Sequence, residues 1–266
     1  SFPIEMGAVK YKWMQRLLYR TEKNLYNSAS HIITLSPDMT AYITGLGIPA
    51  GKVTTNFNGT DISQIEAIAE QEVELFRQKY SLQGKKIVLY AGTYGRANDI
   101  LTLMQTIRSM ATDESIKFIL TGNGYYEPQL RELAQQVPNL LLLEPQPRPE
   151  VFKLFKLANI SLVTFNDLPV LASNSPSKFY DSLACGTPVI VTNPGWTKRF
   201  VEEHRVGWYT PAEEPAALTE SIKSALAQPE ELKAAGARGE AIARKLFNRQ
   251  ELVQDVEQVL VQAVDV

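Results

Sequence analysis

The chain of 266 residues is 44% hydrophobic and 21% charged, and its 27 Lys and Arg residues against 29 Asp and Glu residues give a formal net charge of −2. This balance gives no support to a nucleic-acid-binding surface, which normally shows a basic excess, so no nucleic acid is expected as a partner. No apolar stretch approaches the roughly 20 residues of a membrane span, and the single cysteine, Cys185, excludes an internal disulfide framework and fits a reducing compartment.

The first third of the chain predicts helices separated by two short strands. Residues 8–29 carry apolar side chains at helical spacing, which predicts a long amphipathic helix. Ser36 followed by Pro37 predicts the start of another helix, with the serine as its N-cap and the proline at its first position. The other predicted elements of this part are strands over 31–35 and 52–57, a turn over 58–61 and an acidic helix over 62–80.

Strands and helices alternate from residue 85 onward. Short apolar runs predict strands over 86–92, 117–122, 139–144, 160–165, 188–192 and 207–210. Helices are predicted over 97–111, 126–136, 149–157, 177–184, 197–204, 213–227, 230–245 and 249–263. Continuous apolar strands that alternate with helices predict an α/β fold with a parallel sheet covered on both faces. Residues 1–60 hold too few elements for such a sheet, so we expect them to be the end of another domain.

Ligands of an open parallel sheet bind outside the carboxyl ends of its strands. The loop after the first of these strands contains Gly92, Gly95 and Arg96, and with a helix start near Ala97 it suits a phosphate. A GxxG turn after a strand is also common as a purely structural feature. The loop is not a strict GxGxxG, which weakens a nicotinamide fingerprint, and the absence of GxxxxGK[ST] counts against an ATPase or GTPase.

Two further loops suit a nucleoside. Gly122, Asn123 and Gly124 form a second glycine-rich turn before a helix. Residues 145–151 are rich in proline, which holds the backbone extended and leaves its polar groups free to pair with the edge of a base. A proline-rich surface loop without such a role is an equally good interpretation of this segment alone.

The segment 174–190, "NSPSKFYDSLACGTPVI", predicts a polar turn that leads into a helix. Helix N-termini favour anions, and Lys178 adds a positive charge there. Asp181 lies one turn further along the same face, where a carboxylate can accept hydrogen bonds from ribose hydroxyls. The alternative is a surface ion pair between Lys178 and Asp181 that contributes little. Together, the four loops predict a site for a nucleotide diphosphate.

Several segments resemble bacterial GT-B glycosyltransferases of the GT4-like group. They are "YAGTYGRANDI", "LTGNGYYEPQL", "PSKFYDSLACGTPVI" and the lead-in "ASHIITLSPDM…GIPAGKVTTNFNGTDI". The resemblance implies a Rossmann-like donor-binding half with a remnant of the N-terminal domain. It also implies transfer of a sugar from a nucleotide-diphosphate donor, taken as a UDP-sugar, to a polysaccharide or glycolipid acceptor. Such enzymes usually retain the anomeric configuration and need no metal or other cofactor.

The resemblance also implies roles for individual residues. Arg96 and Lys178 would supply the catalytic positive charges. Contacts to the donor diphosphate and sugar would come from Gly92, Thr93, Gly95, Ser173, Asn174, Ser175 and Ser177. Contacts to the nucleoside would come from Gly122, Asn123, Gly124, Gln146, Pro147, Arg148 and Asp181, with 146–148 acting mainly through backbone atoms. Where many members have glutamates spaced E-x7-E, this chain has Ser173 and Asp181, which alters the contact to the transferred sugar.

The resulting domain prediction is a remnant of the acceptor domain over 1–60, the donor-nucleotide domain over 61–248 and a crossover helix over 249–266. A cytoplasmic location is expected, with association at the inner face of the membrane through the rest of the acceptor domain. Two other functions stay open. One is a nucleotide-sugar 2-epimerase of the same architecture, and the other is a fragment that only binds the nucleotide. His31 and His204 have no partners at metal-ligand spacing, so no metal site is predicted.

Overall fold

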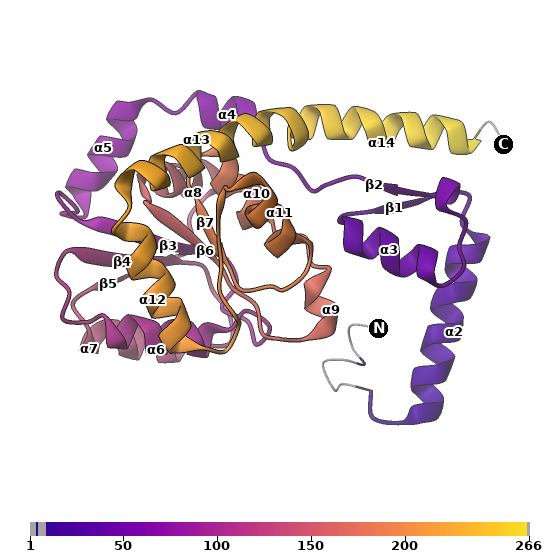
Figure 1. Cartoon of the computed structure of the whole chain (residues 1–266), viewed down its shortest axis with the longest axis horizontal. Helices are drawn as coiled ribbons and strands as arrows, with labels where there is room; N and C mark the ends of the chain where they lie inside the picture. Colours follow the sequence, from indigo (N-terminus) through magenta and orange to yellow (C-terminus); the bar gives the residue numbers. More distant parts are fainter. Residues whose placement is uncertain (1–3, 5–8, 265–266) are drawn as a thin grey trace.

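Two parallel sheets organise the chain in the computed structural model, which describes residues 4 and 9–264 (Figure 1). The small unit consists of α2 (Lys12–Ser28), β1 (Ile32–Thr34), α3 (Pro37–Gly45), the 3₁₀ helix η1 (Ala50–Lys52) and β2 (Val53–Thr55). Ser36 is the N-cap of α3, as predicted, because its Oγ accepts the N–H of Met39. Residues 1–3, 5–8 and 265–266 lie outside the described residues. They include the first residue of the helix predicted over 8–29 and the outer ends of the domain segments predicted over 1–60 and 249–266.

The large unit contains a six-stranded parallel sheet in the order β5-β4-β3-β6-β7-β8. The strands are β3 (Lys86–Ala91), β4 (Ile116–Thr121), β5 (Leu140–Leu143), β6 (Ile160–Val163), β7 (Val189–Val191) and β8 (Gly207–Tyr209). Its helices are α4 (Ile62–Glu66), α5 (Glu70–Lys79), α6 (Ile100–Ser109), α7 (Glu127–Gln136), α8 (Arg148–Leu157), α9 (Pro169–Ala172), α10 (Ser177–Ala184), α11 (Trp196–His204), α12 (Pro215–Leu226), α13 (Pro229–Leu246) and α14 (Arg249–Val264).

Both faces of this sheet are buried, because alternate side chains of its strands enter two separate cores. Ile87 and Leu89 of β3 pack in one core with α5, α8 and α10, whereas Val88 and Tyr90 pack in the other with α6, α7 and α12. Figure 1 shows the strands between these helical layers, with α5 above them and α6, α7 and α12 below. The predicted α/β fold with a covered parallel sheet is therefore confirmed.

Two predicted helices differ from the structure. The acidic helix predicted over 62–80 is divided into α4 and α5, because Ala69 is extended and Glu72 Oε1 accepts its backbone N–H to begin the second helix. The helix predicted to start near Ala97 starts at Ile100 instead. Residues 96–99 form a turn that ends with Asp99 in the left-handed region, and Asn166 Oδ1 accepts the N–H of Asp99.

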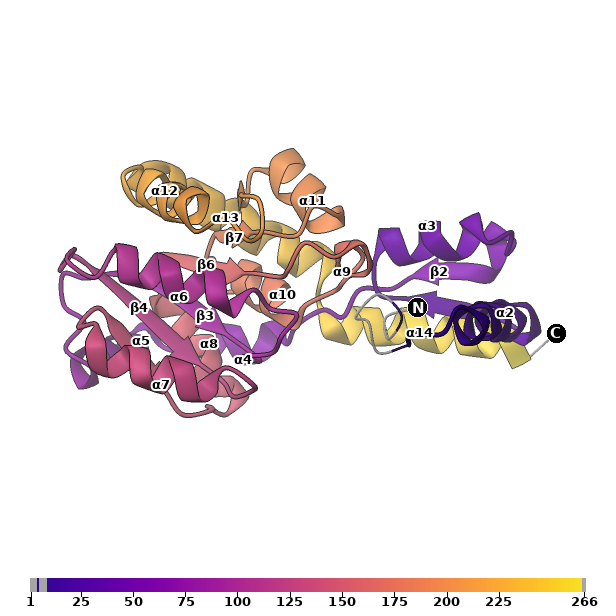
Figure 2. The same ribbon diagram turned by 90° about the horizontal axis from the view of Figure 1, so that it is seen from below.

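The chain crosses between the two units twice, side by side. Residues 56–61, the hinge, lead from β2 into the large unit, and α14 leaves the large unit and extends over the small one (Figures 1 and 2). The crossings are joined by backbone hydrogen bonds from Thr60 N–H to Phe247 O and from Arg249 N–H to Thr60 O. Phe57 packs its ring against Tyr180 and Phe247 of the large unit.

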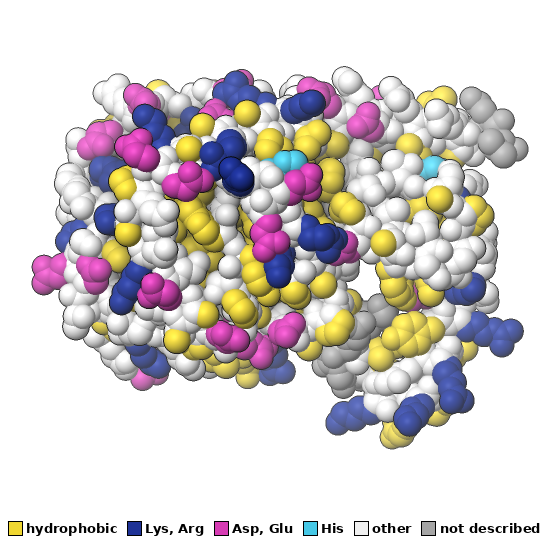
Figure 3. All heavy atoms as spheres, in the orientation of Figure 1, with side chains coloured by type: hydrophobic (Ala, Val, Ile, Leu, Met, Phe, Trp, Pro, Cys, Tyr) yellow, Lys and Arg dark blue, Asp and Glu magenta, His cyan; other side chains and the backbone are white. Residues whose placement is uncertain are grey.

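Helix α2 has no buried residue, and Lys and Arg side chains gather on it in the space-filling view (Figure 3). It therefore adds little to either core. None of the helices within the described residues combines the length and the apolar character needed to cross a bilayer.

Candidate functional site

A cavity of about 840 Å³ opens at the carboxyl ends of β3, β4, β5 and β6. The sheet order reverses between β3 and β6, and such a switch point is where ligands of open parallel sheets bind. The lining comes from the loops after these strands, from α8, α9 and the start of α10 and, in the small unit, from Met39 of α3. Its polar and charged lining residues include Thr93, Asn98, Thr121, Gln146, Arg148, Ser173, Asn174, Ser177, Lys178 and Asp181.

Lys178 provides an enclosed positive charge in this cavity. Its Nζ lies 3.8 Å from the centre of the Tyr90 ring and 5.7 Å from that of Phe165. This nitrogen is buried without a hydrogen-bond partner among the described residues. Burial lowers the pKa of Lys178 to about 7. A buried ammonium group with unused donors creates strong demand for an anionic ligand.

Glycines bring the loops after β3 and β4 close to that lysine. A Cβ on Gly92 would lie 3.1 Å from Lys178 Nζ, so a side chain at this position would intrude on the amine. A Cβ on Gly122 would lie 1.9 Å from the Gly92 carbonyl oxygen, which leaves no room for any other residue. Both glycines have a positive φ, 148° for Gly92 and 146° for Gly122. The cavity wall beside Lys178 is therefore bare backbone.

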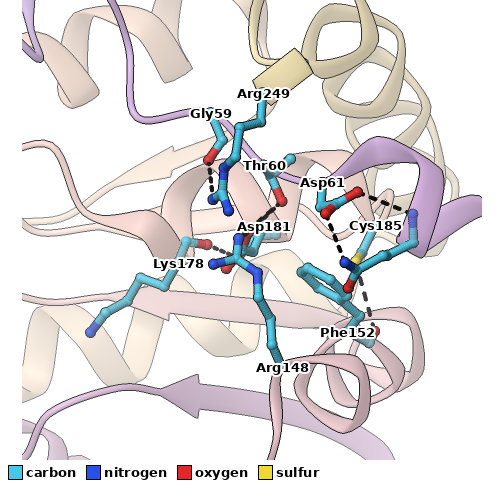
Figure 4. Close-up of polar contacts among 11 residues, drawn as sticks. Gly59, Thr60, Asp61, Arg148, Phe152, Lys178, Asp181, Cys185 and Arg249 are labelled. Atoms are coloured by element: carbon cyan, nitrogen blue, oxygen red, sulfur yellow. Dashed lines mark hydrogen bonds and ion pairs between the residues drawn. The ribbon is translucent and has the colours of Figure 1, made fainter. Parts of the chain in front are cut away.

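Asp181 lies at the other end of the first turns of α10 (Figure 4). Its Oδ1 accepts hydrogen bonds from Thr60 Oγ1 at 2.5 Å and from Arg148 Nη2 at 2.8 Å. Burial raises the pKa of Asp181, whereas the hydroxyl of Thr60 and the charge of Arg148 act in the opposite direction. The carboxylate is buried but paired.

No surface ion pair forms between Lys178 and Asp181, so that alternative is wrong. Asp181 pairs with Arg148, and the Lys178 side chain extends away from it (Figure 4). The two groups supply the cavity with a positive charge near the glycine loops and a negative charge near the hinge.

The structure brings most of the predicted site residues to the cavity. Those that line it are Gly92, Thr93, Gly122, Gln146, Arg148, Ser173, Asn174, Ser177, Lys178 and Asp181. Arg96 is not among them, because its guanidinium stacks at 4.0 Å on the ring of Tyr125, which is 56% exposed. Lys178, rather than Arg96, is therefore the predicted catalytic charge that this conformation presents to the cavity.

The other predicted residues do not line the cavity. Asn123 offers its carbonyl oxygen to Tyr94 N–H at 2.7 Å, and Gly124 packs against the Tyr94 backbone. Ser175 Oγ is hydrogen-bonded to Tyr180 Oη at 2.6 Å rather than turned to the cavity. Pro147 is the N-cap of α8, and Gly95 packs against Asn98.

Sequence reasoning missed Thr60 and Tyr90, the polar lining residues Asn98 and Thr121, and the apolar part of the wall. Thr60 lies 121 residues from its partner Asp181, so no local pattern connects them. Tyr90 lies in a continuous apolar strand, and a tyrosine in such a strand is typical of a core residue. The apolar lining residues Met39, Val151, Phe155, Phe165, Val170 and Leu171 carry no chemical signal in a sequence.

The cavity can bind an elongated ligand with an anionic part near Lys178 and a hydroxyl-bearing part near Asp181. Gly92 N–H already donates to Thr121 O at 2.9 Å. The backbone N–H groups of Thr93 and Ser177, by contrast, have no partner among the described residues and are available to an anion. Within the described residues, no three His, Cys, Asp or Glu side chains are grouped so that they could hold a metal ion.

Comparison with known proteins adds a family match. The family model for glycosyl transferases group 1 matches residues 72–241. A protein of Escherichia coli strain K12, provisionally named colanic acid biosynthesis glycosyl transferase WcaI, is 24% identical over 180 residues, which are 66% of this chain and 44% of that protein. The chain spans 44% to 64% of the length of the curated relatives that it matches.

Solved structures show the same fold. Sucrose-phosphate synthase from Thermosynechococcus elongatus superposes with a TM-score of 0.79 at 21% identity, over 100% of this chain and 66% of the synthase. HepE from Anabaena, solved in complex with UDP, superposes with a TM-score of 0.77 at 20% identity, over 91% of this chain and 67% of HepE.

Proposed function

The chain belongs to the glycosyl transferases group 1 family, and from this premise we propose that its cavity binds the UDP-sugar donor of a glycosyltransferase. The acceptor would be a polysaccharide or glycolipid. We further infer a reaction that retains the anomeric configuration and requires no metal ion.

The enclosed ammonium group of Lys178 is the observation that carries this proposal. It has no hydrogen-bond partner among the described residues, lies against the Gly92 backbone and lines the cavity at the strand ends. A diphosphate would satisfy its three donors together with the free backbone amide at the start of α10. The nucleoside would then extend toward Asp181, whose carboxylate suits ribose hydroxyls.

The choice of uridine rests on relatives. Solved complexes of HepE contain UDP and UDP-glucose. The loop at Gln146 to Arg148 would pair with the base mainly through backbone atoms, so side chains there do not by themselves select uracil over guanine.

Catalysis would come from stabilisation of the leaving group. When the glycosidic bond breaks, negative charge grows on the β-phosphate of UDP. Lys178 would stabilise this charge electrostatically, with the amides at the start of α10 beside it. Arg96 would add a second positive charge only if it left Tyr125 and turned into the cavity.

The direct test is UDP binding by Lys178→Ala. A hydrogen bond to a charged group typically contributes about 1.5–3 kcal/mol, so we expect the dissociation constant measured by titration calorimetry to rise by more than tenfold. Lys198→Ala is the matched control: Lys198 also lies on the first turn of a helix, with its Nζ 4.1 Å from the centre of the Tyr209 ring, but does not line the cavity. Unchanged affinity in Lys178→Ala would remove the basis of the proposal.

A titration panel tests the donor class. Of UDP, GDP, UDP-glucose and UDP-N-acetylglucosamine, the three uridine compounds should have lower dissociation constants than GDP, as the UDP and UDP-glucose complexes of HepE suggest. No heat with any of the four would reject donor binding. A released sugar isomer in the absence of acceptor would identify a 2-epimerase instead.

A further inference from the structure

The hydroxyl of Thr60 is buried and directed at the carboxylate of Asp181. Thr60 is fully enclosed, and its Oγ1 donates to Asp181 Oδ1 at 2.5 Å. Arg148 Nη2 reaches the same oxygen at 2.8 Å and lies 3.5 Å from the Thr60 hydroxyl. Both donors therefore act on one oxygen of the carboxylate.

The second carboxylate oxygen of Asp181, Oδ2, remains free to bind a ligand in the cavity. Asp181 Oδ2 accepts no hydrogen bond from any described residue, while Asp181 lines the cavity. A carboxylate with one oxygen fixed from behind cannot rotate freely about its terminal bond, so the orientation of the other oxygen is fixed as well. An oriented acceptor binds a ligand hydroxyl more tightly than a freely rotating one, because less motion is lost on binding.

Thr60 is better suited to fix this orientation than Arg148. Its backbone is held on both sides, by its N–H on Phe247 O at 2.8 Å and by its carbonyl on Arg249 N–H at 2.9 Å. The preceding Gly59 is packed so closely that a Cβ there would lie 2.8 Å from Phe247 O. The Arg148 side chain, by contrast, is 38% exposed and long, and its Nε has no partner among the described residues.

We propose that Thr60 is a positioning residue for nucleotide binding: its hydroxyl holds Oδ1 of Asp181 so that Oδ2 faces the nucleoside part of the cavity and accepts a ribose hydroxyl. The inference rests on the proposed function, since it takes the ligand to be a ribonucleoside diphosphate. Thr60 itself does not touch the ligand. Thr60 lies on the hinge and Asp181 lies on α10. The carboxylate oxygen that would accept the ribose hydroxyl is therefore held in place by both segments.

The experiment compares UDP with 2′,3′-dideoxy-UDP, which lacks both ribose hydroxyls, by titration calorimetry. Wild-type protein should bind UDP more tightly than the dideoxy compound. Thr60→Val keeps the shape but removes the hydroxyl, which leaves the Asp181 carboxylate freer to rotate. UDP binding should weaken by about tenfold, because most of the hydrogen bond from a ribose hydroxyl to this charged group is lost. The same variant should leave the affinity for the dideoxy compound unchanged.

Thr60→Ser is the rescue control, because it keeps the hydroxyl and should restore the preference for UDP. Thr60→Ala, which adds no apolar branch beside the carboxylate, serves as the second hydroxyl-free variant should Thr60→Val fail to fold, and thermal unfolding reports the fold of each. Equal weakening of both ligands, or a preference for UDP that survives loss of the hydroxyl, would overturn the role of Thr60 while donor binding stands. If wild-type protein binds both ligands equally, the inference fails together with the ribose-binding role of Asp181. If it binds neither ligand, the inference fails together with the proposed donor site.

Discussion

Lys178 and Asp181 lie three residues apart on α10 and experience opposite environments. The lysine is enclosed by aromatic rings and backbone, and the carboxylate is held by a hydroxyl and a guanidinium group. Burial of the charged form of Lys178 carries a free-energy cost, which either deprotonation or a bound anion relieves. Such a residue lowers the stability of the empty protein and raises its affinity for the ligand.

The cost of burying charged Lys178 predicts that the free energy of unfolding depends on pH. The folded-state pKa of Lys178 is about 7, below the ordinary value of 10.5 that applies in the unfolded chain. Between these values the unfolded chain binds a proton that the folded chain does not, so the free energy of unfolding rises with pH, by up to about 1.4 kcal/mol per unit. Below pH 7 both states are charged and this contribution is constant at its least favourable.

Urea unfolding of wild type and Lys178→Met at pH 6, 7, 8 and 9 measures this effect. The methionine variant should be the more stable at pH 6, and its advantage should shrink steadily above pH 7. Lys198→Met corrects for the general effect of removing a lysine from the first turn of a helix. A difference between wild type and Lys178→Met that does not change with pH would mean that the ammonium group is solvated or paired.

At the scale of elements, α10 is positioned by close packing on α13. A Cβ on Gly236 of α13 would lie 2.1 Å from the carbonyl oxygen of Gly186, and one on Gly239 would lie 3.0 Å from Leu183 Cδ2. The missing side chains let the two helices approach, and this contact fixes the helix that carries both Lys178 and Asp181.

Gly236→Ala should therefore destabilise the protein although alanine favours a helix. The overpacking is expected to cost about 1–3 kcal/mol, more than the gain of about 1 kcal/mol in helix propensity, and UDP affinity should fall because α10 shifts. Gly45→Ala at the end of α3 is the control, since a Cβ there meets nothing within 4 Å. Chemical unfolding and calorimetry measure the two effects. A Gly236→Ala protein as stable as Gly45→Ala would refute the packing argument.

Sequence patterns predict the elements better than their ends. The span of α10 agrees with the prediction over 177–184, because Pro176 and Gly186 punctuate it on both sides. The predicted start of α6 is wrong, since Asn166, 67 residues away, accepts the N–H of Asp99 and helps hold the preceding turn. The break between α4 and α5 depends on a side-chain cap from Glu72. No glycine or proline lies between the two helices to indicate this break in the sequence.

At the scale of the whole molecule, the sequence likewise predicts some parts of the site and not others. Loops after strands are identifiable because topology places strand ends at one edge, and this brings Gly92, Gly122 and Lys178 together. The pairing of Asp181 with Thr60 and Arg148 joins residues 121 and 33 positions apart, and the stacking of Arg96 on Tyr125 depends on side-chain conformation. Neither follows from composition, period or spacing.

The two units are joined largely through the side chains beside the crossing. The ring of Phe57 lies 5.2 Å from that of Phe247, 5.6 Å from Trp196 and 6.2 Å from Tyr180. Polar contacts assist, among them Ser36 Oγ to Ser173 O at 2.7 Å and Asn56 Nδ2 to Leu252 O at 2.9 Å. Because Phe57 precedes Thr60 in the hinge, its packing also holds the hinge against α10.

Phe57→Ala should loosen this junction more than it loosens either sheet. Loss of an aromatic side chain from a packed cluster costs about 3–5 kcal/mol when burial is complete, and the lower end applies here because Phe57 is only half-buried. Hydrogen exchange followed by mass spectrometry should show faster exchange over 56–61 and the first turn of α14, with β3 and β4 protected as before. Tyr11→Ala, at a side chain 66% exposed, should leave both regions unchanged. Uniform acceleration across the large sheet would instead show that Phe57 supports the core as a whole, and that the hinge has no separate stability.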